Sequence, residues 1–361
     1  MPQPPRVPGF PPPWSGRPLR AVVSRAPIRI CDNGGWTDTW FARHGRVFNI
    51  AVTPLVEVRI DVFRSDGRPD RVLMVPGGDT EPYARWPENP AWEQHPLLEA
   101  AIQRIGVPDG LALRVKTSSD VPAGASTGTS AAVTVALVGG LASVASTPLG
   151  PDEAAALAHS IETDTLGWQA GVQDQVAAAR GGINFIEVEY PRVKVEPVAI
   201  DEPVRAELES RLVLVYLGRS HMSSAIHEQV IRQLEGRGPD CRELDDLRES
   251  ATRARDAVLA GDLGQLGRAM IENTGAQARL HPDLVGIDAR RVVALAKAHG
   301  AGGWKVNGAG GAGGSITLLA GPGSGARQTL VEAIQRADPR FRHIPVRISF
   351  EGLHTTDTAP A

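Results

Sequence analysis

A loop of small and hydroxyl-bearing residues, 122–130, leads directly into a stretch of small apolar residues, 131–145. The stretch predicts a buried helix whose N-terminus is supplied by the loop. Because the first N–H groups of a helix have no partners within it, and the helix dipole is positive there, such an end favours anions. Glycines let the loop backbone come close to a phosphate. By itself the stretch fits a phosphate-binding loop or an ordinary helix cap, and it lacks the Gly-Lys-Ser/Thr of a Walker A loop.

Bulk composition narrows the class of protein. A chain of 361 residues with 42% hydrophobic content predicts about two domains with substantial cores. The net charge is −3 and the basic residues are dispersed, which argues against a nucleic-acid partner. Two cysteines, Cys31 and Cys241, exclude a disulfide framework and a cysteine-based zinc site. No long apolar run and no N-terminal signal core are present, so we expect a cytoplasmic monomer or homodimer without membrane contact.

The order of patterns along the chain predicts its organisation. Residues 1–20 are rich in proline and are expected to form a disordered tail, since proline neither continues a helix nor pairs within a sheet. Strand and helix patterns then mix without a regular βαβ alternation, which favours an α+β fold. A polar, charged segment at 201–210 is the candidate boundary between domains at 21–203 and 204–361.

Hydrophobic periodicity places the individual elements. Residues 47–63 are expected to form a pair of strands and residues 344–350 a closing strand. The other strands are expected to begin at 21 and to cover 28–30, 111–117, 183–188, 193–200, 212–216, 304–306 and 315–319. The helices are expected at about 97–105, 131–145, 151–167, 171–181, 223–235, 243–260, 262–275, 286–299 and 325–337.

A glycine turn with polar side chains follows the first strand. Arg29 lies on that strand, and the turn reads Gly34-Gly-Trp-Thr-Asp38. The cluster suits a polyol, because Asp38 can accept two hydroxyl hydrogen bonds and Trp36 can pack on a sugar face. The alternative is an Asx-type turn beside a core tryptophan.

Two further stretches carry residues suited to chemistry. Glu162 and Asp174 lie twelve residues apart on consecutive expected helices and could converge on a cation and a reacting hydroxyl; solvated helix carboxylates are the alternative. Lys305 precedes a run with five glycines in seven positions, 308–314. That run indicates a loop that approaches another backbone or a ligand closely, although a flexible surface turn would also fit.

Taken together and in this order, the four stretches resemble the GHMP kinases, the family of galactokinase, homoserine kinase, mevalonate kinase and phosphomevalonate kinase. The loop at 122–132 is similar to the family's Pro-x-x-x-Gly-Leu-Gly-Ser-Ser-Ala-Ala. Ser126 replaces the family glycine, Thr127 the leucine and Thr129 the first serine, whereas Gly128 and Ser130 match. The run 308–314 resembles the third family motif, which supports that loop.

The resemblance implies a two-domain α+β fold, with an N-terminal ribosomal-protein-S5-like domain and a C-terminal α/β-plait-like domain. It implies ATP as phosphoryl donor and Mg²⁺ as cofactor, with Ser130 and Glu162 as metal ligands. Asp174 and Arg29 stand at the catalytic positions. The residues implied to bind the ATP phosphates are Pro122, Ala123, Gly124, Ala125, Ser126, Thr127, Gly128, Thr129 and Ser130. Those implied to support the loop are Gly308, Gly310, Gly311 and Gly313, and those implied to bind substrate are Trp36, Thr37, Asp38, Gly171, Asp174 and Arg219.

Within the family, Gly34-Gly-Trp-Thr-Asp-Thr39 is most similar to the L-fucokinase and heptose 7-phosphate kinase branch. The implied reaction is phosphorylation of a sugar hydroxyl, with the anomeric O1 of a 6-deoxyhexose or of a heptose 7-phosphate as the favoured acceptor. Arg219 and His221 follow an apolar strand and could meet a substrate phosphate or hydroxyl, or merely belong to a surface loop. A non-catalytic sugar- or ATP-binding sensor on the same fold is the alternative function.

Overall fold

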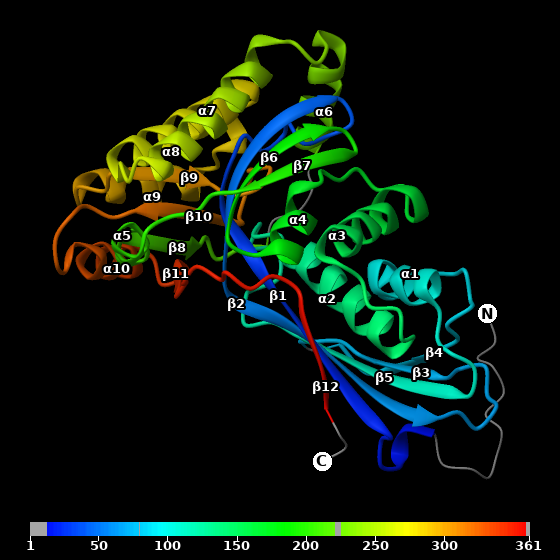
Figure 1. Cartoon of the computed structure of the whole chain (residues 1–361). Helices are drawn as coiled ribbons and strands as arrows, with labels where there is room; N and C mark the ends of the chain where they lie inside the picture. The colour runs from blue at the N-terminus through cyan, green and yellow to red at the C-terminus, as the bar shows by residue number, and fades with distance from the viewer. Residues whose placement is uncertain (1–12, 79, 221–224, 359–361) are drawn as a thin grey trace.

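The computed structural model describes residues 13–78, 80–220 and 225–358, and within these it contains two antiparallel-rich sheets with helices packed on them (Figure 1). The prediction of a tail at 1–20 concerns mostly residues outside that description. Residues 13–15 form a short 3-10 turn, and the first strand begins at Arg20. The larger sheet has the strands β1 (Arg20–Asn33), β2 (His44–Arg64), β3 (Val72–Val75), β4 (Tyr83–Arg85), β5 (Leu111–Ser118), β6 (Ile183–Glu189), β7 (Arg192–Pro197) and β12 (His354–Thr358).

The smaller sheet is formed by the second half of the chain. Its strands follow the order β11 (Arg342–Ile344), β8 (Leu212–Tyr216), β10 (Ser315–Leu319) and β9 (Gly303–Val306). The described helices are α1 (Pro96–Ile105), α2 (Thr129–Val144), α3 (Pro151–Ser160), a π-helical turn η2 (Ile161–Thr165), α4 (Gln173–Arg180), α5 (Glu202–Arg211), α6 (Ala225–Arg237), α7 (Arg242–Leu259), α8 (Leu263–Leu280), a 3-10 turn η3 (Pro282–Leu284), α9 (Ile287–Ala298) and α10 (Ala326–Ala337).

The core explains why α2 is apolar on all sides. This helix packs against β1 and β2 and also contacts α1, α3 and α4, so twelve of its sixteen residues are buried. A helix enclosed in this way needs no polar face. A second core lies between the smaller sheet and the helices α9 and α10. Helices α7 and α8 connect the two halves, because α7 packs on β2 while α8 packs on β9 (Figure 1).

The expected strand pair at 47–63 is wrong, because β2 is one continuous strand of 21 residues. It pairs with β6 through residues 44–50 and with β5 through residues 57–64. Its register against β1 shifts between Pro27 and Ile28, which leaves Thr53 and Pro54 opposite no residue of β1. Proline cannot donate to a ladder, so a bulge at this point lets the strand continue through Pro54.

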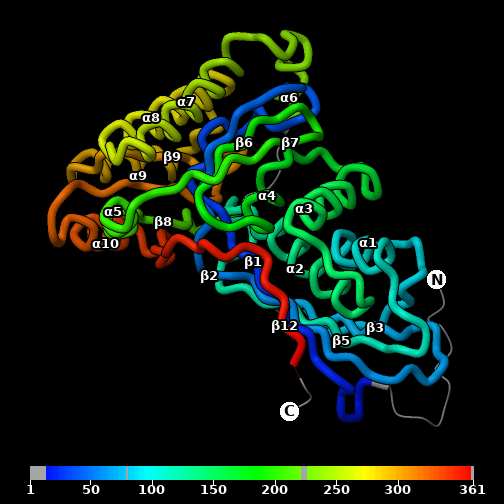
Figure 2. Tube along the Cα trace, viewed as in Figure 1, coloured from blue at the N-terminus to red at the C-terminus, as the bar shows by residue number. Residues whose placement is uncertain are grey.

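The C-terminal part of the chain also differs from expectation. The segment 201–210, expected as a boundary, is mostly helix α5. The expected strand at 344–350 overlaps β11 by one residue, and the chain then crosses to the larger sheet, where β12 pairs with β1. Figure 2 shows this last segment running beside the first strand. The two-domain division at 203 and 204 stays a prediction. Among the described residues, no helix is both long and apolar enough to cross a membrane.

Candidate active site

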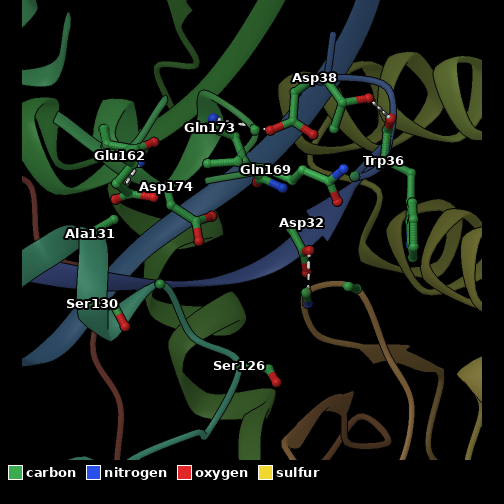
Figure 3. A pocket seen from close by; sticks show the side chains of 18 of the residues that line it. Asp32, Trp36, Asp38, Ser126, Ser130, Ala131, Glu162, Gln169, Gln173 and Asp174 are labelled. Atoms are coloured by element: carbon green, nitrogen blue, oxygen red, sulfur yellow. Dashed lines mark hydrogen bonds between the residues drawn. The ribbon is translucent and has the colours of Figure 1, made fainter. Parts of the chain in front are cut away.

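A cavity of about 750 Å³ lies where the end of β1, the loop before α2 and the start of α4 meet. Each of these elements brings one part of the sequence-predicted site into the cavity (Figure 3). Strand β1 supplies Arg29, the loop supplies residues 124–130, and α4 supplies Asp174. The three stretches are far apart in sequence, so their convergence is a result of the fold.

Arg29 and Asp174 form a bidentate ion pair. The Nε atom donates to Asp174 Oδ1 at 2.8 Å, and Nη2 donates to Asp174 Oδ2 at 3.2 Å. Burial alone would lower the pKa of Arg29, but the nearby carboxylates, Asp174 foremost, outweigh burial and raise it. The guanidinium is therefore a fixed positive charge, and it holds the Asp174 carboxylate in one orientation.

The loop before α2 wraps around Arg29. The third guanidinium nitrogen, Nη1, donates to the carbonyl of Ser126, and the backbone N–H of Arg29 donates to the carbonyl of Thr127 at 2.9 Å. Gly128 caps α2 in the left-handed region, with φ 69°. A Cβ at Gly128 would stand 3.2 Å from the Asp174 carboxylate. Glycine thus lets the helix N-terminus lie directly against the ion pair.

Ser126, which replaces the family glycine, also has a left-handed backbone, with φ 57°. The replacement therefore keeps the conformation that glycine would adopt, at some cost in strain. The hydroxyls of Thr127 and Thr129 lie 3.0 Å apart and hydrogen-bond to each other. Ser130 is exposed in the cavity wall, and its hydroxyl makes no hydrogen bond to the rest of the described chain.

Glu162 lies on the π-helical turn after α3 and faces the same cavity. Its carboxylate accepts a hydrogen bond from Gln175 Nε2 at 3.0 Å. Burial raises the pKa of Glu162 to about 7, against the opposing hydrogen bond from Gln175 and with a further increase from Asp174. The amide oxygen of Gln175 is buried without a hydrogen-bond partner in the described chain. The Gln175 side chain thus holds Glu162 through its nitrogen, while its own oxygen is left without a partner.

Asp38 forms the opposite end of the cavity. One carboxylate oxygen accepts the backbone N–H of Gln173 at 3.1 Å, and Asp38 lines the cavity. Burial raises the pKa of Asp38 to about 6, although the Gln173 hydrogen bond opposes the shift. Gly171 is required here, since its Cβ would stand 2.2 Å from Asp38 Oδ2. Trp36, also predicted, lines the cavity with φ 79° and packs edge-on against His227.

Some predicted residues do not reach the cavity. Thr37 is fully buried, and its hydroxyl donates to the carbonyl of Gly34 at 2.7 Å, so it stabilises the turn. Arg219 is exposed and lies 3.9 Å from Asp288, outside the cavity lining. Pro122 and Ala123 precede the lining part of the loop. His221, the other candidate beside Arg219, lies outside the described residues.

The glycine run 308–314, which follows β9, touches the loop before α2 at Gly308. A Cβ at Gly308 would stand 3.2 Å from Ser126 Cβ, so these two backbones are in close contact. Gly310 and Gly313 instead pack against the carbonyls of Leu284 and Arg219, and Gly311 donates its N–H to Leu284. Only Gly308 of these four lines the cavity.

Several cavity residues were missed in the sequence. They include Asp32, Thr39, Trp40, Phe41, Trp168, Gln169, Gln173, Gln175, His227 and Ile231. The segment 167–171 spans from Glu162 to Asp38, so Trp168 and Gln169 could have been suspected from their position between two candidates. His227 and Ile231 belong to α6, which no motif connects to the turn at 34–38.

Comparisons with known proteins extend these observations. Residues 95–182 match the GHMP kinases N terminal domain. A D-glycero-alpha-D-manno-heptose 7-phosphate kinase of Campylobacter jejuni is 26% identical over 328 residues, which are 88% of this chain and 94% of that protein. A bifunctional fucokinase/GDP-fucose pyrophosphorylase of Arabidopsis thaliana is 26% identical over 320 residues, 84% of this chain and 30% of that longer protein.

A solved structure shares the fold. The D-glycero-D-manno-heptose 1-phosphate kinase from Bacteriodes thetaiotaomicron superposes with a TM-score of 0.71 at 24% identity, over 93% of this chain and 98% of that one. This likeness confirms the α+β fold that the sequence predicted.

Proposed function

Because the chain belongs to the GHMP kinase family, we propose that it is a kinase that transfers the γ-phosphoryl group of Mg-ATP to a sugar hydroxyl. The proposed acceptor atom is the anomeric O1 of a 6-deoxyhexose or of a heptose 7-phosphate. The names of the fucokinase and the heptose 7-phosphate kinase support these two sugar classes. The observation that carries the proposal is the Arg29–Asp174 pair seated against Gly128 at the N-terminus of α2.

Asp174 is proposed to orient the acceptor hydroxyl and take its proton. Its carboxylate lies in the cavity between the phosphate loop and the Asp38 end, which is where the two substrates would meet. Arg29 fixes the orientation of Asp174 and offsets the negative charge that develops during transfer. Asp38 would accept hydrogen bonds from sugar hydroxyls with its carboxylate. Positioning and charge stabilisation, with little covalent chemistry, suffice for this reaction.

The loop residues 124–130 are proposed to bind the ATP phosphates. Their backbone N–H groups and the dipole of α2 favour a polyanion at this position. Pro122 and Ala123 would fix the entry of the loop, and Gly308 would hold its backbone in place from behind. Gly310, Gly311 and Gly313 shape the supporting turn. Trp36 would pack on the sugar, whereas Thr37 and Arg219 have no proposed contact with it.

The residues around Glu162 fit a magnesium ion. Magnesium is usually held by one or two protein oxygens together with substrate phosphates. Oxygen ligands of that kind line the cavity here: the Glu162 carboxylate, the Ser130 hydroxyl and the amide oxygen of Gln175, which has no hydrogen-bond partner in the described chain. A bound Mg²⁺ would neutralise phosphate charge. Ser130 and Glu162 are therefore the proposed ligands, with Gln175 holding the Glu162 carboxylate through its Nε2 donor.

The test is ADP release from Mg-ATP in the presence of a sugar panel that includes L-fucose and D-glycero-D-manno-heptose 7-phosphate. Phosphorus NMR of the product identifies which hydroxyl carries the new phosphate. We expect turnover with one of these sugars and a product phosphorylated at O1. If ligands raise the melting temperature but no sugar is phosphorylated, the chain is a binding protein on a kinase fold.

A further inference from the structure

We propose that Asp32 is a positioning residue for phosphoryl transfer, because it connects Arg29 to the supporting glycine loop at Gly308. Asp32 is fully buried at the end of β1 and lines the cavity. Figure 3 shows its carboxylate directed at the glycine loop, away from Asp174 and Glu162. The inference predicts a loss of kcat, which rests on the proposed kinase function. It also predicts a loss of nucleotide affinity, which can be measured without any turnover.

Both carboxylate oxygens of Asp32 have defined partners. Oδ2 accepts the backbone N–H of Gly308 at 2.9 Å and lies 4.0 Å from Arg29 Nη2. Oδ1 lies 3.3 Å from the ammonium nitrogen of Lys305, which is also fully buried. The Asp32 carboxylate therefore lies between Arg29, in the first half of the chain, and Lys305 and Gly308, in the second half.

Four charged groups, of which Arg29, Asp32 and Lys305 are buried, alternate in sign from one contact to the next. They run from the Asp174 carboxylate to the Arg29 guanidinium, then to Asp32 and to the Lys305 ammonium. Arg29 is thus flanked by a carboxylate on each side, and Asp32 separates it from a second cation. Burial lowers the pKa of Lys305, and Asp32 opposes that shift. Without Asp32, two buried cations would face each other, and their repulsion would displace Arg29.

The backbone of Gly308 is held on both sides of its Cα, at its N–H and at its carbonyl. Asp32 accepts its N–H, and Gln277 Nε2 donates to its carbonyl at 2.9 Å. Gly308 in turn lies against Ser126, whose carbonyl accepts the Arg29 guanidinium. Asp32, Gly308, Ser126 and Arg29 therefore form a closed ring of contacts. A shift of Asp32 moves both the phosphate loop and the guanidinium.

Two effects follow from that ring. Loss of the Asp32 charge should misplace Arg29 on Asp174 and lower kcat. It should also loosen the hold on the Gly308 N–H, because a neutral acceptor binds an N–H less strongly than a carboxylate does, and so weaken nucleotide binding. Misplacements of about 1 Å remote from the reacting atoms can cost about 100-fold in rate, so substantial effects are expected although Asp32 touches neither substrate in the proposed arrangement.

The experiment uses Asp32→Asn, Lys305→Met and the double variant in the full chain. Asn keeps the shape of Asp and can still accept the Gly308 N–H, but it leaves Lys305 without its counter-charge. Replacing both members of a buried pair by neutral groups is often tolerated in stability, so the double variant should recover the melting temperature lost in Asp32→Asn. We expect kcat about 10-fold or more below wild type in both variants that lack Asp32, in line with the cost of misplaced groups. In Asp32→Asn, Lys305 repels Arg29, and in the double variant Arg29 still lacks the carboxylate that lies 4.0 Å from its Nη2 atom. Mg-ADP affinity, measured by calorimetry, should fall in the same two variants.

A matched control is Asp61→Asn. Asp61 is another buried strand carboxylate paired with arginines, Arg59 and Arg114, and it lies opposite Ala21 at the far end of β1. It should lose stability while kcat and Mg-ADP affinity stay at wild-type values.

Two results would overturn the inference. One is a double variant that regains wild-type kcat and Mg-ADP affinity together with its melting temperature, because the pair would then be purely structural. The other is an Asp32→Asn variant with unchanged kcat and affinity. A wild-type chain that neither binds Mg-ADP nor phosphorylates any sugar would instead contradict the proposed function itself.

Discussion

Two glycines of the site exist because carboxylates occupy the space of their side chains. A Cβ at Gly171 would overlap the Asp38 carboxylate, with 2.2 Å to Oδ2, and one at Gly128 would press on Asp174 at 3.2 Å. The glycines are thus as necessary for the site as the charged residues they admit. The sequence shows that these positions are glycines but not why, because the carboxylate that excludes a side chain at each one lies elsewhere in the chain.

Gly171→Ala should raise the KM for the sugar by about 10-fold or more while the KM for ATP changes little, because misplacing a binding group costs rate and affinity at that end only. Steady-state kinetics with each substrate varied in turn will measure this. Gly236→Ala is the control, since no atom lies within 4 Å of a Cβ there. An unchanged sugar KM in a folded Gly171→Ala chain would contradict the assignment of Asp38.

Asp174→Asn should lower kcat by about 100-fold or more, which is the usual loss when a general base is removed. The asparagine can still accept a hydrogen bond from Arg29, so folding should be preserved. Single-turnover rates with saturating Mg-ATP will measure the effect. Asp152→Asn, which alters an exposed ion pair with Arg180, is the control. A folded Asp174→Asn protein that keeps most of its activity would remove Asp174 from this role.

At the level of elements, the loop at 122–130 keeps its shape through backbone conformation, whatever the side chain. Ser126 adopts the left-handed region that the family glycine would occupy, and its carbonyl is the atom that contacts Arg29. The hydroxyls of Thr127 and Thr129 bond to each other. The loop's departures from the motif it resembles are therefore compatible with the proposed anion-binding geometry, in which Ser130 is the proposed cation ligand.

Ser126→Gly should raise the free energy of unfolding by up to about 1 kcal/mol, since a left-handed L-residue costs about 1–2 kcal/mol and glycine returns part of that as backbone entropy. Ser146, with φ 60° after α2, offers the matched control: Ser146→Gly should give a similar gain. Chemical denaturation measures both. kcat should stay within about twofold of wild type in each, because the contact made by residue 126 is through its backbone. A tenfold loss only in Ser126→Gly would show that the Ser126 hydroxyl binds phosphate.

The sequence alone was sufficient for those elements whose pattern is local. The 122–130 loop, the buried helix after it and the two carboxylates on consecutive helical segments follow from spacing and composition. The continuity of β2 through Pro54 could not be predicted, since it depends on a bulge against β1. The burial of Thr37 could not be predicted either, because it depends on contacts with Gly45 and Arg46 of β2. The inclusion of His227 depends on how α6 packs against Trp36.

At the scale of the whole molecule, the site holds carboxylates that folding makes harder to ionise. Burial raises the pKa of Asp38 from 3.8 to about 6 and that of Glu162 from 4.5 to about 7. Both groups bind protons more tightly in the folded than in the unfolded chain, so their contribution to stability is full below about pH 4 and is lost as the pH rises through 6 and 7. At neutral pH, ionisation of these two buried carboxyl groups therefore lowers the free energy of unfolding.

The double variant Asp38→Asn/Glu162→Gln should lack this dependence. Between pH 4 and 7.5 the melting temperature of the ligand-free wild type should fall relative to that of the variant, because only the wild type must ionise buried groups. Thermal unfolding at a series of pH values, at constant ionic strength, measures the difference. Parallel curves for the two proteins would contradict the raised pKa values.

The long separations within the site have a consequence for how the chain reaches its native state. Arg29 and Asp174 are 145 residues apart, and Lys305 contacts Asp32 across 273 residues. Strand β1 is also paired with β12, 337 residues later at Arg20 and Asp357. Folding is slower when native contacts join residues far apart in sequence, because a long loop must close before each contact forms. During synthesis the ring around Arg29 cannot close until residue 308 has left the ribosome, so the proposed nucleotide site is incomplete while only the first half of the chain has been made.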